Sequence, residues 1–206
     1  MADRYLITQS LLSSWLYLYN CYEDYADEAM ADFMRTLHRI PSEQNEAMKA
    51  GSDFEALVYA IADGASYDQN AKTISGAEQV AQIVKGGQYQ VALSKEIEVN
   101  GMTFLLYGVL DVLKAGIIYD IKFKTKSFGS LDLAGAYLDS PQHPAYFALV
   151  PEAREFNYLV SDGKDLYIET YTPDMVEPIE NTIVEFMDFL DTMGFMPDYK
   201  EYWLAK

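Results

Sequence analysis

The sequence predicts a single α/β domain in which a central mixed β-sheet is flanked by helices. Its 206 residues suit one sizeable domain, and 50% of them are hydrophobic, which is enough for a core and too apolar for a disordered chain. Segments with helical spacing of apolar residues come first, and strand-rich segments interrupted by further helices follow. No linker or internal repeat divides the chain, so we expect N-terminal helices in residues 1–87 and the sheet with its helices in residues 88–206.

Charge and cysteine content limit the classes of function. The chain has 15 Lys and Arg against 32 Asp and Glu, a net charge of −17, which argues against broad nucleic-acid binding through a basic face. Residues 109–126 are a local exception, with four lysines against two aspartates. The single cysteine, Cys21, excludes an internal disulfide and a cysteine-built metal cluster. No apolar run reaches the ~18 residues of a membrane span and no signal-peptide pattern is visible, so we expect a cytoplasmic protein without a membrane partner.

Two helices are predicted near the N-terminus. The first covers residues 8–20, is rich in aromatic residues, and has Thr8 or Ser10 as its N-cap. The second covers residues 24–38, and its acidic first turn suits the helix dipole.

A third and longer helix is expected to begin at Ser42, which follows Pro41, and to end near Asp63. Its apolar residues recur with helical spacing, at Phe54, Leu57, Val58 and Ile61. A short helix at about residues 76–84 should end at the glycine pair that follows it.

Three strand-rich segments come next, at residues 89–99, 102–114 and 117–125. The dipeptide Asn100-Gly101 is a strong hairpin signal, and Ala115-Gly116 is a weaker one. Together they predict an antiparallel meander of three strands.

The rest of the chain should add a helix, a hairpin and a helix. Ser140-Pro141 begins a helix that runs to about Val150. A hairpin turns around Asp162-Gly163, with strands at residues 156–160 and 165–171, and a last helix spans about residues 175–193.

The second hairpin carries the candidate chemistry. If its turn is centred on Ala115-Gly116, Asp111 lies opposite Asp120 on one face of the sheet, and Lys122 shares that face. Two like charges opposed in this way cost stability, and a divalent cation compensates for them. Carboxylate oxygens suit Mg²⁺ or Mn²⁺. The alternative is a solvated face with Lys122 as an ion-pair partner, but the apolar flanks of both strands favour the metal site.

Glu55 is the candidate for a third carboxylate. It lies one turn after Gly51 on the third predicted helix, where a glycine would let the helix approach the sheet closely. The alternative is a glutamate in water at the edge of the apolar stripe.

Four short motifs occur in a fixed order, and the chain resembles one known superfamily through them. They are Gly51-Ser-Asp-Phe-Glu55, Gly108-Val-Leu-Asp111, Asp120-Ile-Lys122 and Gln142-His-Pro-Ala-Tyr146. Their order resembles the PD-(D/E)XK nuclease superfamily, in particular its RecB-like and phage exonuclease branch. The resemblance covers residues 51–146 and implies a restriction-endonuclease-like domain. It implies a Mg²⁺- or Mn²⁺-dependent deoxyribonuclease, an exonuclease of the phage or prophage recombination and repair type.

The resemblance also implies roles for the site residues. Asp111, Asp120 and Glu55 would bind the metal, with the Ile121 carbonyl completing the ligand set. Lys122 would orient the attacking water or neutralise charge on the phosphate.

Substrate contacts are implied by the same resemblance. Gln142 and Tyr146 share a helix face and would contact DNA or the metal shell, although a packed tyrosine and a capping glutamine are equally compatible with the sequence. Lys124 and Lys126 would steer phosphate, although solvated lysines are the more common case.

Two departures from the family pattern leave other functions open. Many members of this branch have His in place of Glu55, and some bind an iron–sulfur cluster through four cysteines; with Cys21 alone, no iron–sulfur cluster is expected. The net charge of −17 also opposes DNA binding by an enzyme that acts without a partner, because DNA is negatively charged. The alternatives are therefore a catalytically inactive nuclease-like protein that serves as a binding or assembly module, or an acidic interaction module. The expected partners are DNA and a recombination partner protein.

Two further groups of residues have weaker predictions. Tyr17, Tyr19, Tyr22 and Tyr25 could stack on bases, but packing on the domain or on a partner is favoured. His38 and His143 lack ligand spacing and are expected to be solvated or capping residues.

Overall fold

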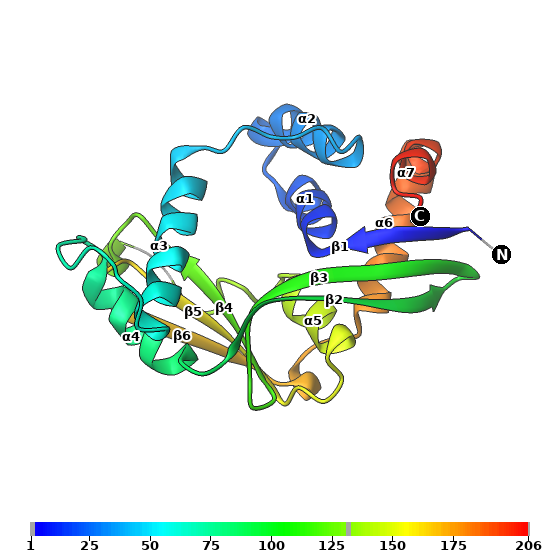
Figure 1. Cartoon of the computed structure of the whole chain (residues 1–206). Coiled ribbons are helices and arrows are strands. Elements are labelled where there is room, and N and C mark those ends of the chain that lie inside the picture. Colours follow the sequence, from blue (N-terminus) through cyan, green and yellow to red (C-terminus); the bar gives the residue numbers. More distant parts are fainter. Residues whose placement is uncertain (1–2, 131–132, 206) are drawn as a thin grey trace.

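The computed structural model describes residues 3–130 and 133–205, and it confirms the predicted class: a mixed β-sheet flanked by helices (Figure 1). The helices and strands in chain order are β1 (Arg4–Thr8), α1 (Gln9–Asn20), α2 (Ala26–Leu37), α3 (Glu46–Ala62), α4 (Ile74–Val84), β2 (Gln88–Val99), β3 (Met102–Lys114), β4 (Ile117–Phe123), α5 (Gln142–Leu149), β5 (Glu155–Ser161), β6 (Leu166–Tyr171), α6 (Ile179–Met193) and α7 (Met196–Tyr202). Short 3-10 turns lie at η1 (Glu23–Tyr25), η2 (Phe128–Ser130) and η3 (Pro173–Met175). No helix in these ranges is long and apolar enough to cross a bilayer.

The long strand β3 organises the sheet. One edge of β3 pairs antiparallel with β2 along almost its whole length. Its other edge is shared, because β1 pairs in parallel with residues 103–107 and β4 pairs antiparallel with residues 112–114. Residues 108–111 of β3 therefore have no strand beside them on that edge. Beyond β4 the sheet continues with β5, parallel to β4, and then with β6, antiparallel to β5.

Both predicted turns of the three-strand meander are confirmed. Asn100 and Gly101 have φ values of 51° and 78°, and Ala115 and Gly116 have φ values of 51° and 75°. Two consecutive residues with positive φ define the tight turn whose twist matches antiparallel strands. The weaker signal at Ala115-Gly116 therefore sets the register of β3 and β4 as firmly as the Asn-Gly turn sets that of β2 and β3.

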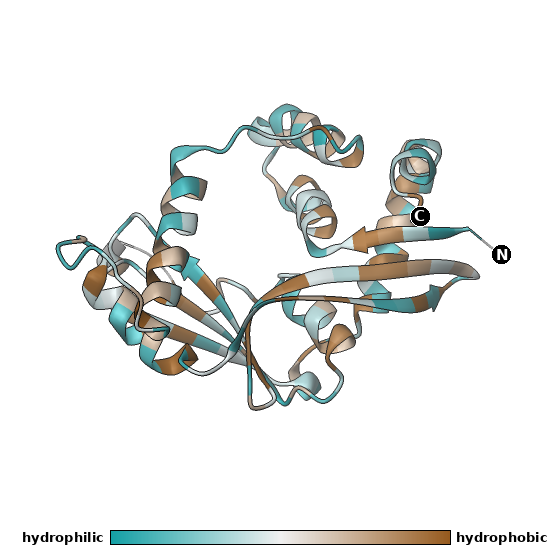
Figure 2. Ribbon diagram, viewed as in Figure 1, coloured by the Kyte–Doolittle hydropathy of each residue, from teal (hydrophilic) through white to brown (hydrophobic). Residues whose placement is uncertain are grey.

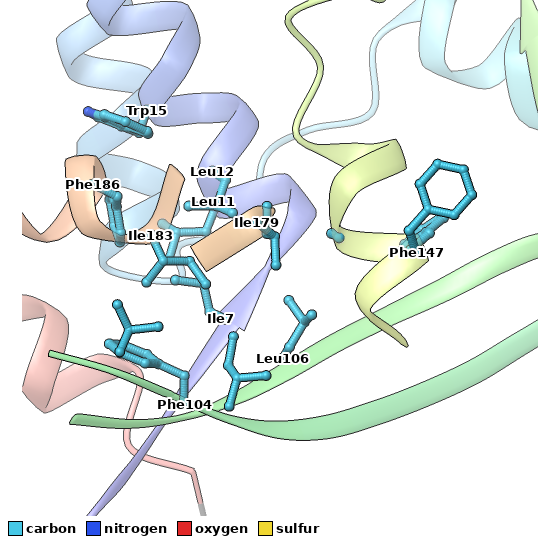
Figure 3. Close-up of a cluster of buried hydrophobic side chains, with 14 of the residues drawn as sticks. Ile7, Leu11, Leu12, Trp15, Phe104, Leu106, Phe147, Ile179, Ile183 and Phe186 are labelled. Carbon is cyan, nitrogen blue, oxygen red and sulfur yellow. The ribbon is translucent and has the colours of Figure 1, made fainter. Parts of the chain in front are cut away.

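Helices cover both faces of the sheet and bury separate clusters of hydrophobic side chains. On one face α3 and α4 pack on the β4 and β5 end, and the buried residues of this cluster are Phe54, Val58, Ala62, Ala77, Val80, Ala81, Val84, Val112, Ile121 and Leu159. The larger cluster lies on the other face, where side chains of α1 and α6 meet those of β1 and β3 (Figure 3). Hydrophobic residues follow β3 along its length, whereas the helices alternate between hydrophobic and hydrophilic residues (Figure 2).

Two helix starts differ from the prediction. Ser42 does not cap the third helix: α3 begins at Glu46, and Asn45 is its N-cap, accepting a hydrogen bond from the Met48 N–H at 2.8 Å. The last long helix begins at Ile179 and not near residue 175. Pro178 explains this start, because a proline disfavours helical geometry in the residue before it.

Two elements were not predicted, and they lie against each other. The main-chain N–H of Leu6 in β1 donates to the carbonyl of Trp203, which directly follows α7. The hydroxyl of Tyr199 in α7 donates to the Leu6 carbonyl at 3.0 Å, and the Trp203 indole donates to the Leu37 carbonyl at 2.7 Å. These contacts fasten α7 to β1 and to the end of α2.

Candidate active site

The candidate site lies where β3 and β4 separate. Leu113 pairs with Ile118 and Val112 with Tyr119, which is the register predicted from the turn. The next opposed positions, Asp111 and Asp120, are beyond the last paired residues. In place of a main-chain ladder, the Asp111 carboxylate accepts a hydrogen bond from the Ile121 N–H, with Oδ2 at 2.8 Å.

Tyrosine hydroxyls contact two main-chain carbonyls of β3 near the opening. The Tyr146 hydroxyl on α5 donates to the Val109 carbonyl at 2.7 Å, and the Tyr59 hydroxyl on α3 lies 3.1 Å from the Asp111 carbonyl oxygen. Buried carbonyls need such partners, so these side chains stabilise the open edge. Both contacts flank Asp111, which lies where the pairing of β3 with β4 ends.

Asp120, Lys122 and Gln142 form a connected network at the same opening. Asp120 is 1% exposed, and its Oδ2 lies 2.8 Å from the Lys122 ammonium. The Gln142 amide donates to Asp120 Oδ1, while Gln142 Oε1 accepts from Lys122 at 3.2 Å. Apart from the ion pair with Lys122, Asp120 Oδ2 has no hydrogen-bond partner in the described part of the chain. One buried carboxylate oxygen is thus left with capacity for a further ligand.

Glu55 extends from α3 toward the same opening. Its Oε1 accepts hydrogen bonds from the Tyr59 hydroxyl at 2.5 Å and from the Gln90 side chain at 2.6 Å. Gln90 has a positive φ of 50° and stands opposite Asp111 at a skipped position in the pairing of β2 with β3. Tyr59 and Gln90 therefore position Glu55 beside Asp111.

The electrostatics of the site show an excess of negative charge. Burial raises the pKa of Asp111 to about 8, and the charges of Asp120 and Glu55 act in the same direction. The Ile121 N–H and Lys122 oppose this rise only in part. Burial alone would lower the pKa of Lys122, but the charge of Asp120 and its hydrogen bond outweigh burial and raise it.

The oxygen atoms at this opening are of the chemical type that hard divalent cations bind. Within residues 3–130 and 133–205 no group of three or more His, Cys, Asp or Glu side chains is already arranged to hold a metal ion. The chemistry of the opening nevertheless suits Mg²⁺ or Mn²⁺, because three carboxylates gather there and a buried Asp120 oxygen lacks a hydrogen bond. Asp111, Asp120 and Glu55 are the residues that could hold such an ion.

The pKa of Asp111 predicts that stability falls as the pH rises. Because the folded pKa is about 8, the folded protein keeps a proton between about pH 4 and pH 8 that the unfolded chain releases. The free energy of unfolding without divalent metal should therefore decrease through this window, by at most about 1.4 kcal/mol per pH unit. Asp111→Asn should flatten the decrease in urea titrations made at several pH values. Equal slopes for the variant and the wild type would contradict the assignment.

Gly108 is required by close packing, whereas Gly51 is not. A Cβ at Gly108 would lie 2.6 Å from the Tyr146 ring, but a Cβ at Gly51 would meet nothing within 4 Å. The expectation that Gly51 allows a close approach of the helix is therefore wrong. The close approach is that of α5 to β3, at Gly108.

The two glycines make a matched pair for a stability test. Gly108→Ala should lower the free energy of unfolding by about 1–3 kcal/mol, because Tyr146 must move. Gly51→Ala should raise it by about 0.5–1 kcal/mol, because alanine is favoured over glycine inside a helix. Urea denaturation measures both, and a Gly108→Ala protein as stable as wild type would contradict the packing argument.

The remaining predicted residues are Tyr146, Lys124, Lys126 and Ile121. Tyr146 is 5% exposed and its hydroxyl is bound to Val109, so it is a packed tyrosine at the edge of the site. The Lys124 ammonium lies 5.5 Å from the centre of the Tyr137 ring, and Lys126 is exposed on the loop after β4. For Ile121 the main-chain N–H has a defined partner, Asp111, while the role of its carbonyl stays a prediction.

Sequence reasoning missed an aromatic group beside the network. Tyr158 pairs with Asp120 across β4 and β5, and the Tyr137 ring stacks on it with centres 4.2 Å apart. His143 Nδ1 lies 3.1 Å from the Tyr158 hydroxyl. The expectation of a solvated or capping His143 is wrong: the side chain is 2% exposed, and burial lowers its pKa to about 4. The strand pairing of β4 with β5 would have been needed to find this group.

Comparisons with known proteins place the fold but not the function. No protein-family model matches this chain, and a search of curated proteins finds no significant match. Among solved structures, the fold is similar to that of the crystal structure of SSO0001, with a TM-score of 0.53 and 15% sequence identity. The similarity covers 94% of this chain and 78% of that one. At this level of identity the likeness concerns the architecture alone, so the chemistry must be argued from the site.

Proposed function

We propose that this chain is a metal-dependent DNA nuclease that hydrolyses phosphodiester bonds. The observation that carries the proposal is the gathering of Asp111, Asp120 and Glu55 with Lys122 at the opening between β3 and β4. Acidic residues that would bind a cation and an ammonium that would meet an anion suit a reaction at a phosphate. The motif resemblance to the PD-(D/E)XK superfamily supports the same function.

In this function the acidic side chains would bind the metal and Lys122 would contact the phosphate. Asp111, Asp120 and Glu55, with the Ile121 carbonyl, would hold Mg²⁺ or Mn²⁺. A bound divalent ion supplies Lewis acidity toward a phosphate oxygen and lowers the pKa of water. Lys122 would donate hydrogen bonds to the phosphate as negative charge develops on it.

Other residues would position these groups or the substrate. Gln142 already bonds to both Asp120 and Lys122, so it would keep the carboxylate and the ammonium in a fixed relation. Lys124 and Lys126 would attract the DNA backbone toward the opening. Tyr146 would act by holding the Val109 carbonyl at the edge of the site.

Within this proposal the enzyme is a cytoplasmic exonuclease of the phage or prophage recombination type, formed by one restriction-endonuclease-like domain. A second function is a catalytically inactive nuclease-like protein that serves as a binding or assembly module. The net charge of −17 favours the second function, since DNA repels such a chain. The intact set of three carboxylates and one lysine favours the first.

Incubation with linear and closed circular DNA in Mn²⁺, Mg²⁺ or EDTA separates the two functions. An exonuclease should degrade linear DNA in Mn²⁺ or Mg²⁺, leave closed circles intact and be silent in EDTA. Cleavage of the circles would indicate an endonuclease. If neither metal supports cleavage of any DNA, the enzyme proposal fails and the binding function takes its place.

A further inference from the structure

A groove that shares none of the candidate metal-binding residues lies on the surface of the molecule. Its main part is a cavity of about 530 Å³ bounded by α1, by residues 138–144 and by the start of α6. A second cavity of about 320 Å³ adjoins it along α1. The residues that line both cavities are Leu16, Asn20, Asp139, Ser140 and Pro141. We call the two cavities together the α1 groove.

Large apolar side chains are unusually exposed along the α1 groove. Tyr19, Leu138, Met175 and Tyr17 all line it, with exposed fractions of 70%, 63%, 60% and 56%. Single exposed apolar residues are ordinary, but several gathered around one hollow indicate a surface that another molecule covers. Tyrosines are also enriched in protein interfaces, because they offer a large rigid ring with a polar tip.

The α1 groove is negatively charged, which favours a positively charged partner. Asp139, Glu177 and Glu185 line it, and all three are exposed. No lysine or arginine is among the described residues that line either cavity. Carboxylates beside exposed tyrosine rings suit the cationic heads of lysine and arginine, whose hydrocarbon stems pack on apolar groups such as Leu138 and Met175.

We propose that the α1 groove docks a lysine- and arginine-rich segment of a partner protein. A nucleic acid would bring its phosphates next to the carboxylates of the groove. No lysine or arginine among the described lining residues would neutralise those phosphates. A second copy of this chain would bring a net charge of −17 toward the same surface. A basic protein segment is complementary in both charge and apolar character. This inference rests on the groove alone and does not depend on nuclease activity.

The α1 groove also lies next to the candidate site. Pro141 lines the groove and is the N-cap of α5, whose first residue, Gln142, bonds to Asp120. His143 lines the groove as well, and its ring contacts the Tyr158 hydroxyl. A segment bound in the groove would therefore contact the part of the chain that positions Gln142. A basic partner would also supply positive charge, which this acidic chain lacks.

Binding of defined probes tests the proposal. A fluorescein-labelled peptide rich in Arg, Lys and Leu is titrated with the whole protein, beside a peptide with Glu in place of every basic residue and a single-stranded oligonucleotide. The basic peptide should bind, and its affinity should fall as salt rises from about 50 to 300 mM. Glu177→Gln/Glu185→Gln should weaken binding about fivefold or more, from loss of two charge pairs. Tyr19→Ala should weaken it without any change of charge.

A matched control excludes non-specific attraction to an acidic protein. Glu98→Gln/Glu201→Gln removes the same charge at exposed positions that line neither cavity, and it should bind like wild type. Circular dichroism confirms that each variant is folded. No binding of the basic peptide overturns the proposal, and so do equal losses in the two double variants. Tighter binding of the oligonucleotide, or self-association of the protein through this face, also overturns it.

Discussion

Asp120→Asn is expected to abolish DNA cleavage and also the stabilisation of the protein by Mg²⁺ or Mn²⁺. Asp120 is almost fully buried, and one of its oxygens has no partner except the Lys122 ammonium. Asparagine keeps the shape of the side chain but removes the charge that would hold a cation. Cleavage should fall on the order of 10²–10³-fold or more.

The thermal part of this prediction does not require an active enzyme. Metal at about 100 times its dissociation constant should stabilise wild type by about 2.7 kcal/mol. For a chain of this size that corresponds to a rise in Tm of about 5–10 °C. Asp53→Asn is a matched control, because Asp53 is exposed on α3 only two residues from Glu55. The control should keep the full rise, whereas a rise that survives in Asp120→Asn would remove Asp120 from the metal site.

The geometry of the site was predictable as far as local sequence determines it. The Ala115-Gly116 turn fixes which residues of β3 and β4 face each other, and the pairing of Leu113 with Ile118 follows that prediction. A two-residue turn sets the register directly, and a shift of one residue would place the two aspartates on opposite faces of the sheet. Glu55 reached the site for a similar reason, because helical spacing placed it at the edge of the stripe that packs on the sheet.

The separation of β3 from β4 was not predictable in the same way. The same edge of β3 is shared with β1, which pairs with the first half of β3 although nearly a hundred residues separate them in the chain. The hydrogen bonds from the Ile121 N–H to the Asp111 carboxylate and from the Tyr59 hydroxyl to the Asp111 carbonyl lie at that opening and link different elements. Contacts of this kind arise from tertiary packing, which periodicity along one segment does not contain.

Gly51 illustrates a different failure. The motif Gly51-Ser-Asp-Phe-Glu55 predicts a close approach of the helix to the sheet at Gly51. Yet open space surrounds Gly51, while the glycine that does allow close packing is Gly108, against Tyr146. Sequence alone shows where a side chain is absent, but only the packing shows whether that absence is used.

Lys122→Met is expected to lower cleavage on the order of 10²-fold while keeping stabilisation by metal. In the described structure the ammonium neutralises Asp120 and lies 5.9 Å from the centre of the Tyr158 ring. A phosphate would compete with Asp120 for this same ammonium, and charge that develops on the phosphate during reaction would strengthen that contact. Methionine keeps the apolar stem, whereas alanine would leave a cavity beside the buried Asp120.

The thermal readout separates a role in reaction from a role in folding. Without metal, Lys122→Met should be less stable than wild type, because a buried carboxylate loses its counter-charge. Added Mn²⁺ should restore much of that stability, since a lysine ammonium has no lone pair for a metal and is not a ligand. Cleavage measured in saturating Mn²⁺ should still be low, and Lys49→Ala, an exposed lysine on α3, should cleave like wild type. Cleavage by Lys122→Met at the wild-type rate would mean that Lys122 serves only as the counter-charge of Asp120.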